Sequence, residues 1–152
     1  MVEIYIDGDA CPVKDETRRV ATRHGLTVYL VGNRLMGPHD DPLLKRIVVE
    51  GTPDAADDWI AEKVAANDIV ITADIPLAAR AVAKGATVLK PDGRVLDTDA
   101  IGMAKAVRDL NMHLRDIGEL SGGPGGFRKQ HRSRFLDKLE TLVQAAKRAK
   151  PR

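Results

Sequence analysis

Residues 4–12 read IYIDGDACP, an apolar run that leads directly into two carboxylates separated by one glycine. The run at residues 2–6 predicts a buried strand. A helix is expected at residues 13–24, because apolar positions recur on one side of it and Gly25 follows its end. The next apolar run, at residues 26–31, predicts a second strand. This strand–helix–strand order indicates an α/β domain.

The same alternation continues along the chain. Further strands are expected at 46–49, 69–72 and 86–89, and further helices at 42–45, 54–66, 75–84 and 98–114. The strands read as short continuous apolar runs, which is typical of a parallel sheet covered by helices on both faces. The expected fold class is therefore α/β, with a central, mostly parallel sheet flanked by helices in three layers.

Residues 120–127 read LSGGPGGF and interrupt the alternation, because four glycines around one proline suit neither a helix nor an interior strand. Apolar residues at spacings of three and four then predict a last amphipathic helix. Its apolar positions are Phe135, Leu136, Leu139, Leu142, Val143 and Ala146. We expect an α/β domain at residues 1–120, with a glycine-rich loop and a basic helix at residues 121–152 packed on the same domain.

Composition narrows the class of protein. The chain has 152 residues, of which 43% are hydrophobic and only 3% aromatic, which suits one globular domain and argues against base stacking on many exposed rings. No apolar run approaches the roughly 20 residues that span a bilayer, and the N-terminus lacks the features of a secretory signal. Cys11 is the single cysteine and suits a reducing compartment. We expect a cytoplasmic protein that does not bind membranes.

Charge is distributed unevenly. Residues 121–152 carry nine Lys or Arg and two Asp or Glu, whereas the rest of the chain carries fifteen Lys or Arg and twenty Asp or Glu. One interpretation is a solvated final helix. The other is a contact with the phosphate backbone of a nucleic acid, for which Arg128, Lys129 and Arg132 are the candidates.

The first chemical candidates are Asp7, at the end of the first strand, and Asp9, in the turn that follows. Sites in open α/β sheets form at the carboxyl ends of the strands. Carboxylates this close repel each other unless a cation or hydrogen bonds offset the repulsion. Asp9 has an alternative role in capping the next helix, whose start also suits Pro12.

A second acidic cluster, Asp54, Asp57 and Asp58, opens the helix expected at 54–66. Helix capping and the helix dipole explain all three equally well. Helical phase separates two of them, since Asp57 falls about 40° from the centre of the apolar stripe and Asp58 falls on the far side. That stripe consists of Ala56, Ile60 and Val64. Asp57 is therefore the better metal ligand, and Asp58 the better supporting or solvent-facing residue.

The third candidate is Asp74, which directly follows the strand at residues 69–72. Its alternative role is to cap the next helix, which begins near Pro76. Thr72 could donate a hydrogen bond to a neighbouring carboxylate. Carboxylate oxygens suit Mg²⁺ or Mn²⁺, metals that activate water in phosphodiester cleavage.

Together these patterns predict a site at one edge of the sheet. The expected metal ligands are Asp7, Asp9, Asp57, Asp58 and Asp74, and the expected catalytic residues are Asp7, Asp57 and Asp74. Substrate-binding candidates are Asn33, Arg34, Thr72, Arg128, Lys129 and Arg132. Arg34 could contact a phosphate or could simply be a solvated loop residue.

Four segments resemble the YaiI/YqxD family of uncharacterised bacterial proteins: DGDACPVK at 7–14, ADDWI at 56–60, DIVITADIPLAA at 68–79 and GGP at 122–124. The likeness covers nearly the whole chain. It implies a PIN-like fold related to the NYN group of nucleases, in which acids at strand ends coordinate Mg²⁺ or Mn²⁺ for RNA cleavage.

The resemblance also implies a role for each acid. Asp7 is similar to the first-strand acid of that superfamily, and Asp57 or Asp58 to its helix-start acid. Asp74 is similar to its later strand-end acid, and Asp9 to the second acid of NYN-type Asp-x-Asp turns.

Three hypotheses about function follow. The leading one is a metal-dependent nuclease acting on RNA. The second is a haloacid-dehalogenase-like phosphatase with Asp7 as nucleophile, although Cys11 stands where that motif usually has Thr or Val. The third is a non-catalytic RNA-binding or ribosome-associated module that keeps the metal site.

Overall fold

The computed structural model describes residues 2–7, 12–32, 43–49, 55–103, 106 and 129–149. At its centre lies a five-stranded sheet in the order β3-β2-β1-β4-β5, in which each pair of neighbouring strands is parallel. The strands are β1 (Glu3–Asp7), β2 (Thr27–Gly32), β3 (Leu44–Val48), β4 (Ile69–Ile71) and β5 (Thr87–Leu89). The expected α/β class is confirmed.

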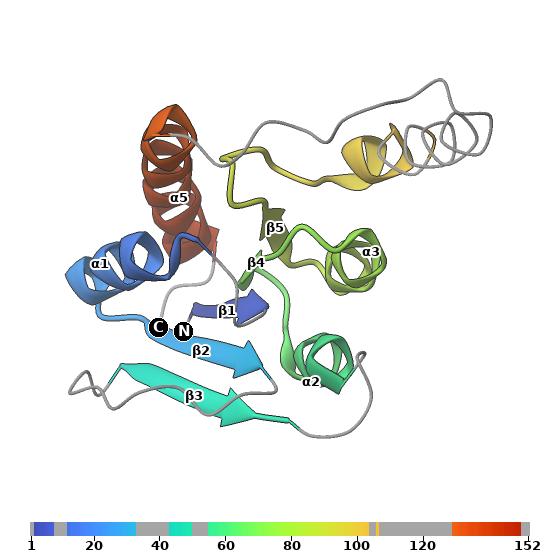
Figure 1. The fold of residues 1–152 in the computed structure, drawn as a ribbon, viewed down its shortest axis with the longest axis horizontal. Coiled ribbons are helices and arrows are strands. Elements are labelled where there is room, and N and C mark those ends of the chain that lie inside the picture. The colour runs from blue at the N-terminus through green and yellow to red at the C-terminus, as the bar shows by residue number, and fades with distance from the viewer. Residues whose placement is uncertain are drawn as a thin grey trace.

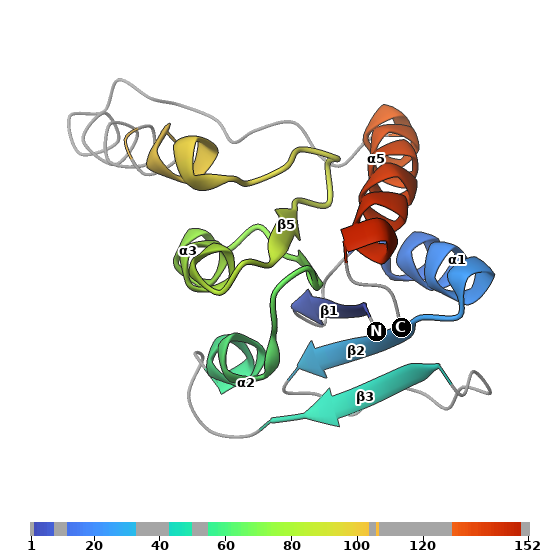
Figure 2. The same ribbon diagram turned by 180° about the vertical axis from the view of Figure 1, so that it is seen from behind.

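Helices cover both faces of the sheet (Figure 1). On one face lie α1 (Lys14–His24) and α5 (Lys129–Ala149), and on the other lie α2 (Ala55–Lys63) and α3 (Ile75–Ala83), as the view from behind also shows (Figure 2). Each face has its own buried cluster. Ile4 and Ile6 of β1 point into the first, whereas Tyr5 points into the second, as alternation along a strand requires. The expected three layers are therefore present.

The strand β3 corrects one expectation. A short helix was expected at residues 42–45, but Leu44 and Lys45 belong to β3, where they pair with Val28 and Tyr29 of β2. The ladder begins even earlier, since the amide of Val28 donates to the carbonyl of Leu43 at 2.8 Å. Pairing along β2 satisfies these backbone groups and places Leu44 against the core, which outweighs a weak local helix propensity.

The helix ends differ modestly from those expected. The helix α1 ends at His24 as predicted, and Gly25 follows with a φ of 67°, the left-handed conformation common after helices. The helix α2 ends at Lys63 instead of residue 66, and Asn67 follows with a φ of 70°. Residues 98–103 are helical, and Asp97 caps them by accepting from the amide of Ala100 at 2.8 Å. The rest of the helix expected to reach residue 114, and the glycine-rich segment at 120–127, lie outside the described residues.

The last helix packs deeply against the sheet. Phe135, Leu139 and Val143 of α5 are fully buried in the same cluster as Ile4 and Ile6. In addition, the turn at Gly93, where φ is 93°, packs closely against α5. The approach is so close that a Cβ at this position would lie 2.7 Å from the Arg134 Cγ. Within the described part of the chain, no helix is both long and apolar enough to cross a membrane.

Candidate functional site

The ends of β1 and β4 are joined by a side-chain hydrogen bond. The register pairs Ile6 with Ile71, so Asp7 and Thr72 follow side by side. The Thr72 hydroxyl donates to Asp7 Oδ2 at 2.8 Å and accepts from the amide of Asp74 at 3.0 Å. Thr72 is buried. One threonine therefore connects two of the predicted site acids at the carboxyl edge of the sheet, and it donates to a carboxylate as expected.

Asp74 serves as the N-cap of α3. Its Oδ1 accepts from the amide of Leu77 at 2.8 Å, and Pro76 occupies the first turn. The alternative role considered for Asp74 is thus real. Among the described residues its other oxygen, Oδ2, has no hydrogen bond, so capping leaves half of the carboxylate available to a ligand.

The two aspartates of α2 lie in different environments. Asp57 is half-buried in the first turn of the helix, whereas Asp58 is exposed and pairs with Arg80 at 2.8 Å. The helix packs on β1 and β2, and in a parallel α/β sheet its start faces the carboxyl edge. The structure therefore separates the two residues in the way that helical phase predicts. That Asp57 or Asp58 binds a metal stays a prediction.

Several site candidates lie outside the described residues, namely Asp9, Asn33, Arg34 and Arg128. The N-cap position of α1 is Val13, which makes no side-chain cap. Across the ranges that the structure describes, no three His, Cys, Asp or Glu side chains form a group that could hold a metal ion. The described part of the candidate site thus consists of Asp7, Thr72 and Asp74, which the Thr72 hydroxyl connects.

The basic candidates of α5 differ from each other. Lys129 is exposed at the start of the helix. Arg132, by contrast, contacts the beginning of α1: its Nη1 donates to the carbonyl of Pro12 at 2.8 Å and lies 3.0 Å from Glu16 Oε2. The sequence carries no signal for this contact, because the partners are 116 and 120 positions away and Glu16 reads as an ordinary first-turn acid.

A buried acid at the opposite edge of the sheet has a structural role. Asp68, at the amino end of β4, accepts from the amide of Glu3 with Oδ1 and from the amide of Ala65 with Oδ2, both at 3.0 Å. It is 1% exposed. Burial at a strand end is therefore not sufficient to make an acid of this protein a site residue.

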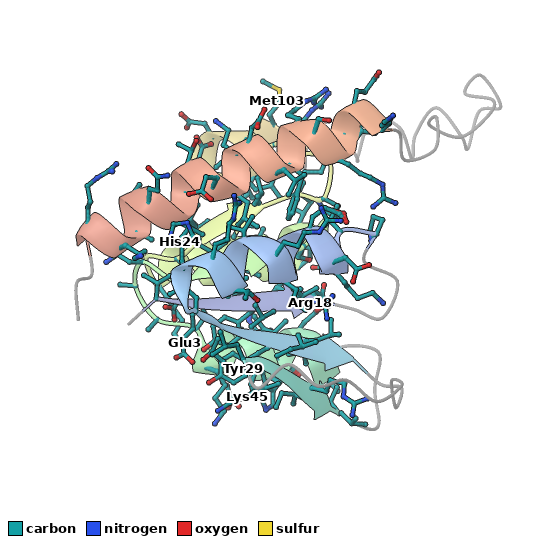
Figure 3. All side chains as sticks on the ribbon, turned by 90° about the vertical axis from the view of Figure 1, so that its left-hand side faces the viewer. Glu3, Arg18, His24, Tyr29, Lys45 and Met103 are labelled. Carbon is teal, nitrogen blue, oxygen red and sulfur yellow. The ribbon has the colours of Figure 1, made fainter. Side chains whose placement is uncertain are left out.

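An aromatic group that sequence reasoning missed lies between α2 and the sheet. The rings of Tyr5 and Tyr29 stack with centroids 5.0 Å apart, and Trp59 tilts against both. The hydrogen bond with Glu3 and burial raise the pKa of Tyr29 to about 12. Lys45 lies over the Tyr29 ring at 5.8 Å, and Figure 3 shows Glu3, Tyr29 and Lys45 grouped together. Trp59 belongs to α2, and Tyr5 and Tyr29 belong to strands of the sheet, so the packing of these rings on each other forms part of the contact between helix and sheet.

Comparison with known proteins gives a consistent family. The family model described as "Uncharacterized BCR, YaiI/YqxD family" matches residues 5–145. A UPF0178 protein of Parvibaculum lavamentivorans is 58% identical over 151 residues, which cover 99% of each chain. A UPF0178 protein of Gluconacetobacter diazotrophicus is 57% identical over 98% of this chain and 97% of its own. One from Rhodospirillum rubrum is 52% identical over 98% of this chain and 100% of its own. No solved structure matches the chain.

Proposed function

Since the chain belongs to the YaiI/YqxD family of uncharacterised bacterial proteins, we propose a function from its site: a PIN-like, Mg²⁺- or Mn²⁺-dependent nuclease that hydrolyses phosphodiester bonds in RNA. The observation that carries the proposal is the Thr72 hydroxyl, which connects Asp7 and Asp74 at the carboxyl edge of adjacent parallel strands. Ligand sites of open α/β sheets form at this edge.

The chemistry of the donors fits such a metal. Mg²⁺ takes hard oxygen ligands and is usually held by one or two carboxylates, with water and substrate phosphate completing its shell. Asp7 and Asp74 would supply the carboxylates, with Asp9, Asp57 and Asp58 as further candidates. When bound, a metal of this kind activates water and stabilises negative charge in phosphodiester cleavage.

The chain's own residues have distinct roles in this proposal. Thr72 fixes one oxygen of Asp7, which orients the carboxylate before any ligand arrives. Asp74 uses Oδ1 to hold the start of α3, and its Oδ2 would be the oxygen that binds the metal. The RNA backbone would be held by cations. The candidates are Lys129, which is exposed at the start of α5, together with Arg128 and Arg34, and Asn33 is a further substrate-binding candidate.

The test is hydrolysis of a generic RNA in the presence of Mn²⁺ or Mg²⁺. We expect cleavage by the wild type and loss of cleavage by Asp7→Asn, which keeps the shape of the side chain and removes its charge. Asp137→Asn is the matched control, because it makes the same change at an exposed position of α5. Absence of cleavage by the wild type with every divalent metal tried would remove the catalytic claim.

A second candidate function is a non-catalytic RNA-binding module. It is favoured by the nine Lys or Arg against two acids in residues 121–152. In that case RNA binding would survive Asp7→Asn and would be weakened when the exposed Lys129 and Lys138 of α5 are replaced by Gln, changes that leave the buried face of the helix intact. Unchanged RNA binding by the Lys129→Gln, Lys138→Gln double variant would rule this candidate out.

A further inference from the structure

The start of α5 is bonded to the chain just after β1. Arg132 Nη1 donates to the Pro12 carbonyl at 2.8 Å and contacts both oxygens of Glu16, at 3.0 and 3.2 Å. Pro12 and Glu16 bracket the first turn of α1. A residue late in the sequence thus holds the segment that leads from the first site acid into the first helix.

The contact with Glu16 is partly buried. The Glu16 side chain is 7% exposed, whereas that of Arg132 is 46% exposed. A carboxylate this deeply buried is costly unless it is paired and hydrogen-bonded, and a guanidinium can bond several oxygens in one plane. Arg132 therefore has a strong structural reason to stay on Glu16 and Pro12 instead of turning toward a substrate.

Asp7 and Pro12 are both anchored by residues far away in the sequence. Thr72 holds Asp7 at the end of β1, and Arg132 holds Pro12 at 2.8 Å. Beyond Pro12 the chain is also fixed, since Val13 is fully buried and its carbonyl accepts from the Thr17 hydroxyl at 2.8 Å. The chain on either side of residues 8–11 is therefore held in place, and one of the two anchors is Arg132.

The rest of α5 keeps Arg132 in register with α1, and Figure 3 shows the two helices side by side. At the other end of α1, Arg23 and His24 pair with Glu140 in the middle of α5, at 3.0 Å and 2.7 Å. Beside Arg132, Gly93 packs on the backbone of Arg134, where a Cβ would approach the carbonyl carbon to 2.9 Å. The helix cannot slide along α1 without breaking these contacts.

We propose that Arg132 is a positioning residue: it fixes Pro12 and Glu16 at the start of α1, the helix that comes after the first-strand acid Asp7, and so supports the metal-binding edge. The inference rests on the proposed metal site and gives Arg132 a role other than the phosphate contact expected from its charge. A residue that positions the site changes metal affinity, whereas a residue that binds phosphate changes the affinity for RNA.

The experiment measures Mn²⁺ binding to the full chain by isothermal titration calorimetry, and kcat and KM for RNA cleavage. The variants are Arg132→Gln, Arg132→Lys and, as a control, Arg19→Gln, which removes the same charge at an exposed position of α1. Loss of supporting contacts around a metal site commonly weakens metal binding by about 10- to 100-fold. We expect at least about tenfold weaker Mn²⁺ binding for Arg132→Gln, with the KM for RNA unchanged. Arg19→Gln should bind Mn²⁺ as the wild type does.

A readout that does not depend on metal accompanies the titration. Amide hydrogen exchange in peptides covering residues 12–17 should be faster in Arg132→Gln than in Arg19→Gln. If Arg132→Gln does not fold, Arg132→Lys carries the test, because a single ammonium cannot bond Pro12 and Glu16 in the geometry of the guanidinium. We expect Arg132→Lys to bind Mn²⁺ measurably more weakly than the wild type.

The outcomes separate the inference from the function on which it rests. If the wild type and Arg132→Gln bind Mn²⁺ equally, or if only the KM for RNA rises, Arg132 does not position the site and the proposed function stands. If Arg132→Gln does not fold, equal Mn²⁺ affinities of Arg132→Lys and the wild type overturn the inference in the same way. If the wild type itself binds no Mn²⁺, the proposed metal site and the inference fall together.

Discussion

The hydroxyl of Thr72 donates a hydrogen bond to Asp7 Oδ2 at 2.8 Å, and the hydroxyl oxygen of Thr72 accepts a hydrogen bond from the amide of Asp74 at 3.0 Å. Thr72→Val keeps the shape of the side chain but removes the hydrogen bond from each of the two partners, both of which are half-buried. We expect a loss of about 1–3 kcal/mol in the free energy of unfolding, measured by urea denaturation. Thr72→Ser retains the hydroxyl and should recover much of that loss. Wild-type stability of Thr72→Val would mean that the hydroxyl and its two hydrogen bonds do not stabilise the fold.

Asp74 has a capping role and a proposed ligand role, and two substitutions separate them. Asparagine caps helices about as well as aspartate, so Asp74→Asn should retain stability while it weakens Mn²⁺ binding. Asp74→Ala removes the acceptor for the amide of Leu77 and should also cost about 1 kcal/mol in the free energy of unfolding. Wild-type Mn²⁺ affinity in Asp74→Asn would leave Asp74 with capping alone.

Gly93 and Gly25 both have positive φ, but only Gly93 is crowded. A Cβ at Gly93 would lie within 3 Å of three Arg134 atoms, whereas a Cβ at Gly25 meets nothing within 4 Å. Gly25→Ala should therefore cost about 1 kcal/mol from backbone strain alone. Gly93→Ala should cost more, because α5 must also shift. Thermal unfolding of the two variants compares their stabilities directly. If Gly93→Ala proves more stable than Gly25→Ala, the close packing of α5 on Gly93 is contradicted.

The pKa of Glu140 gives a pH prediction. A hydrogen bond from Gln144 lowers this pKa most, and the neighbouring His24 and Arg23 lower it further against the opposing effect of burial. A carboxyl whose pKa is lower in the folded state stabilises the fold above its unfolded value and loses that contribution as pH falls through the folded value. Between neutral pH and the acid range below the ordinary value of 4.5, the wild type should lose more stability than Glu140→Gln. Parallel urea titrations of the two proteins at pH 7 and pH 3.5 measure the difference. Equal losses would mean that Glu140 does not contribute.

Much of the fold could be predicted because local patterns agree with it. The apolar runs of β1 and β4 are short, continuous and followed by acids, and both become buried strands of the sheet. Helical phase in α2 separated Asp57 from Asp58 before any contact was known. The start of β3 could not be predicted in this way, because Leu44 is only half-buried, Lys45 is exposed, and the strand depends on pairing with β2.

The site was predictable only in part, for a similar reason. The carboxyl ends of neighbouring parallel strands lie at the same edge of the sheet, which brings Asp7 close to Thr72. The contact of Arg132 with Pro12 and Glu16 depends on how α5 lies across α1, and charge pattern alone suggested a surface cation. Residues that lie together at one edge of the sheet can be predicted from the strand pattern. Residues that contact this region from a distant helix, as Arg132 does, cannot.

The burial of Phe135 beside the first strand also bears on synthesis at the ribosome. The cluster around Ile4 and Ile6 contains Phe135, Leu139 and Val143, so the earliest and latest parts of the chain complete the same core. Contacts between distant parts of a sequence slow folding, and here they cannot form until α5 has been translated. Until then a nascent chain carries an uncovered apolar face on β1 and α1, the kind of surface that makes incompletely folded chains prone to aggregation.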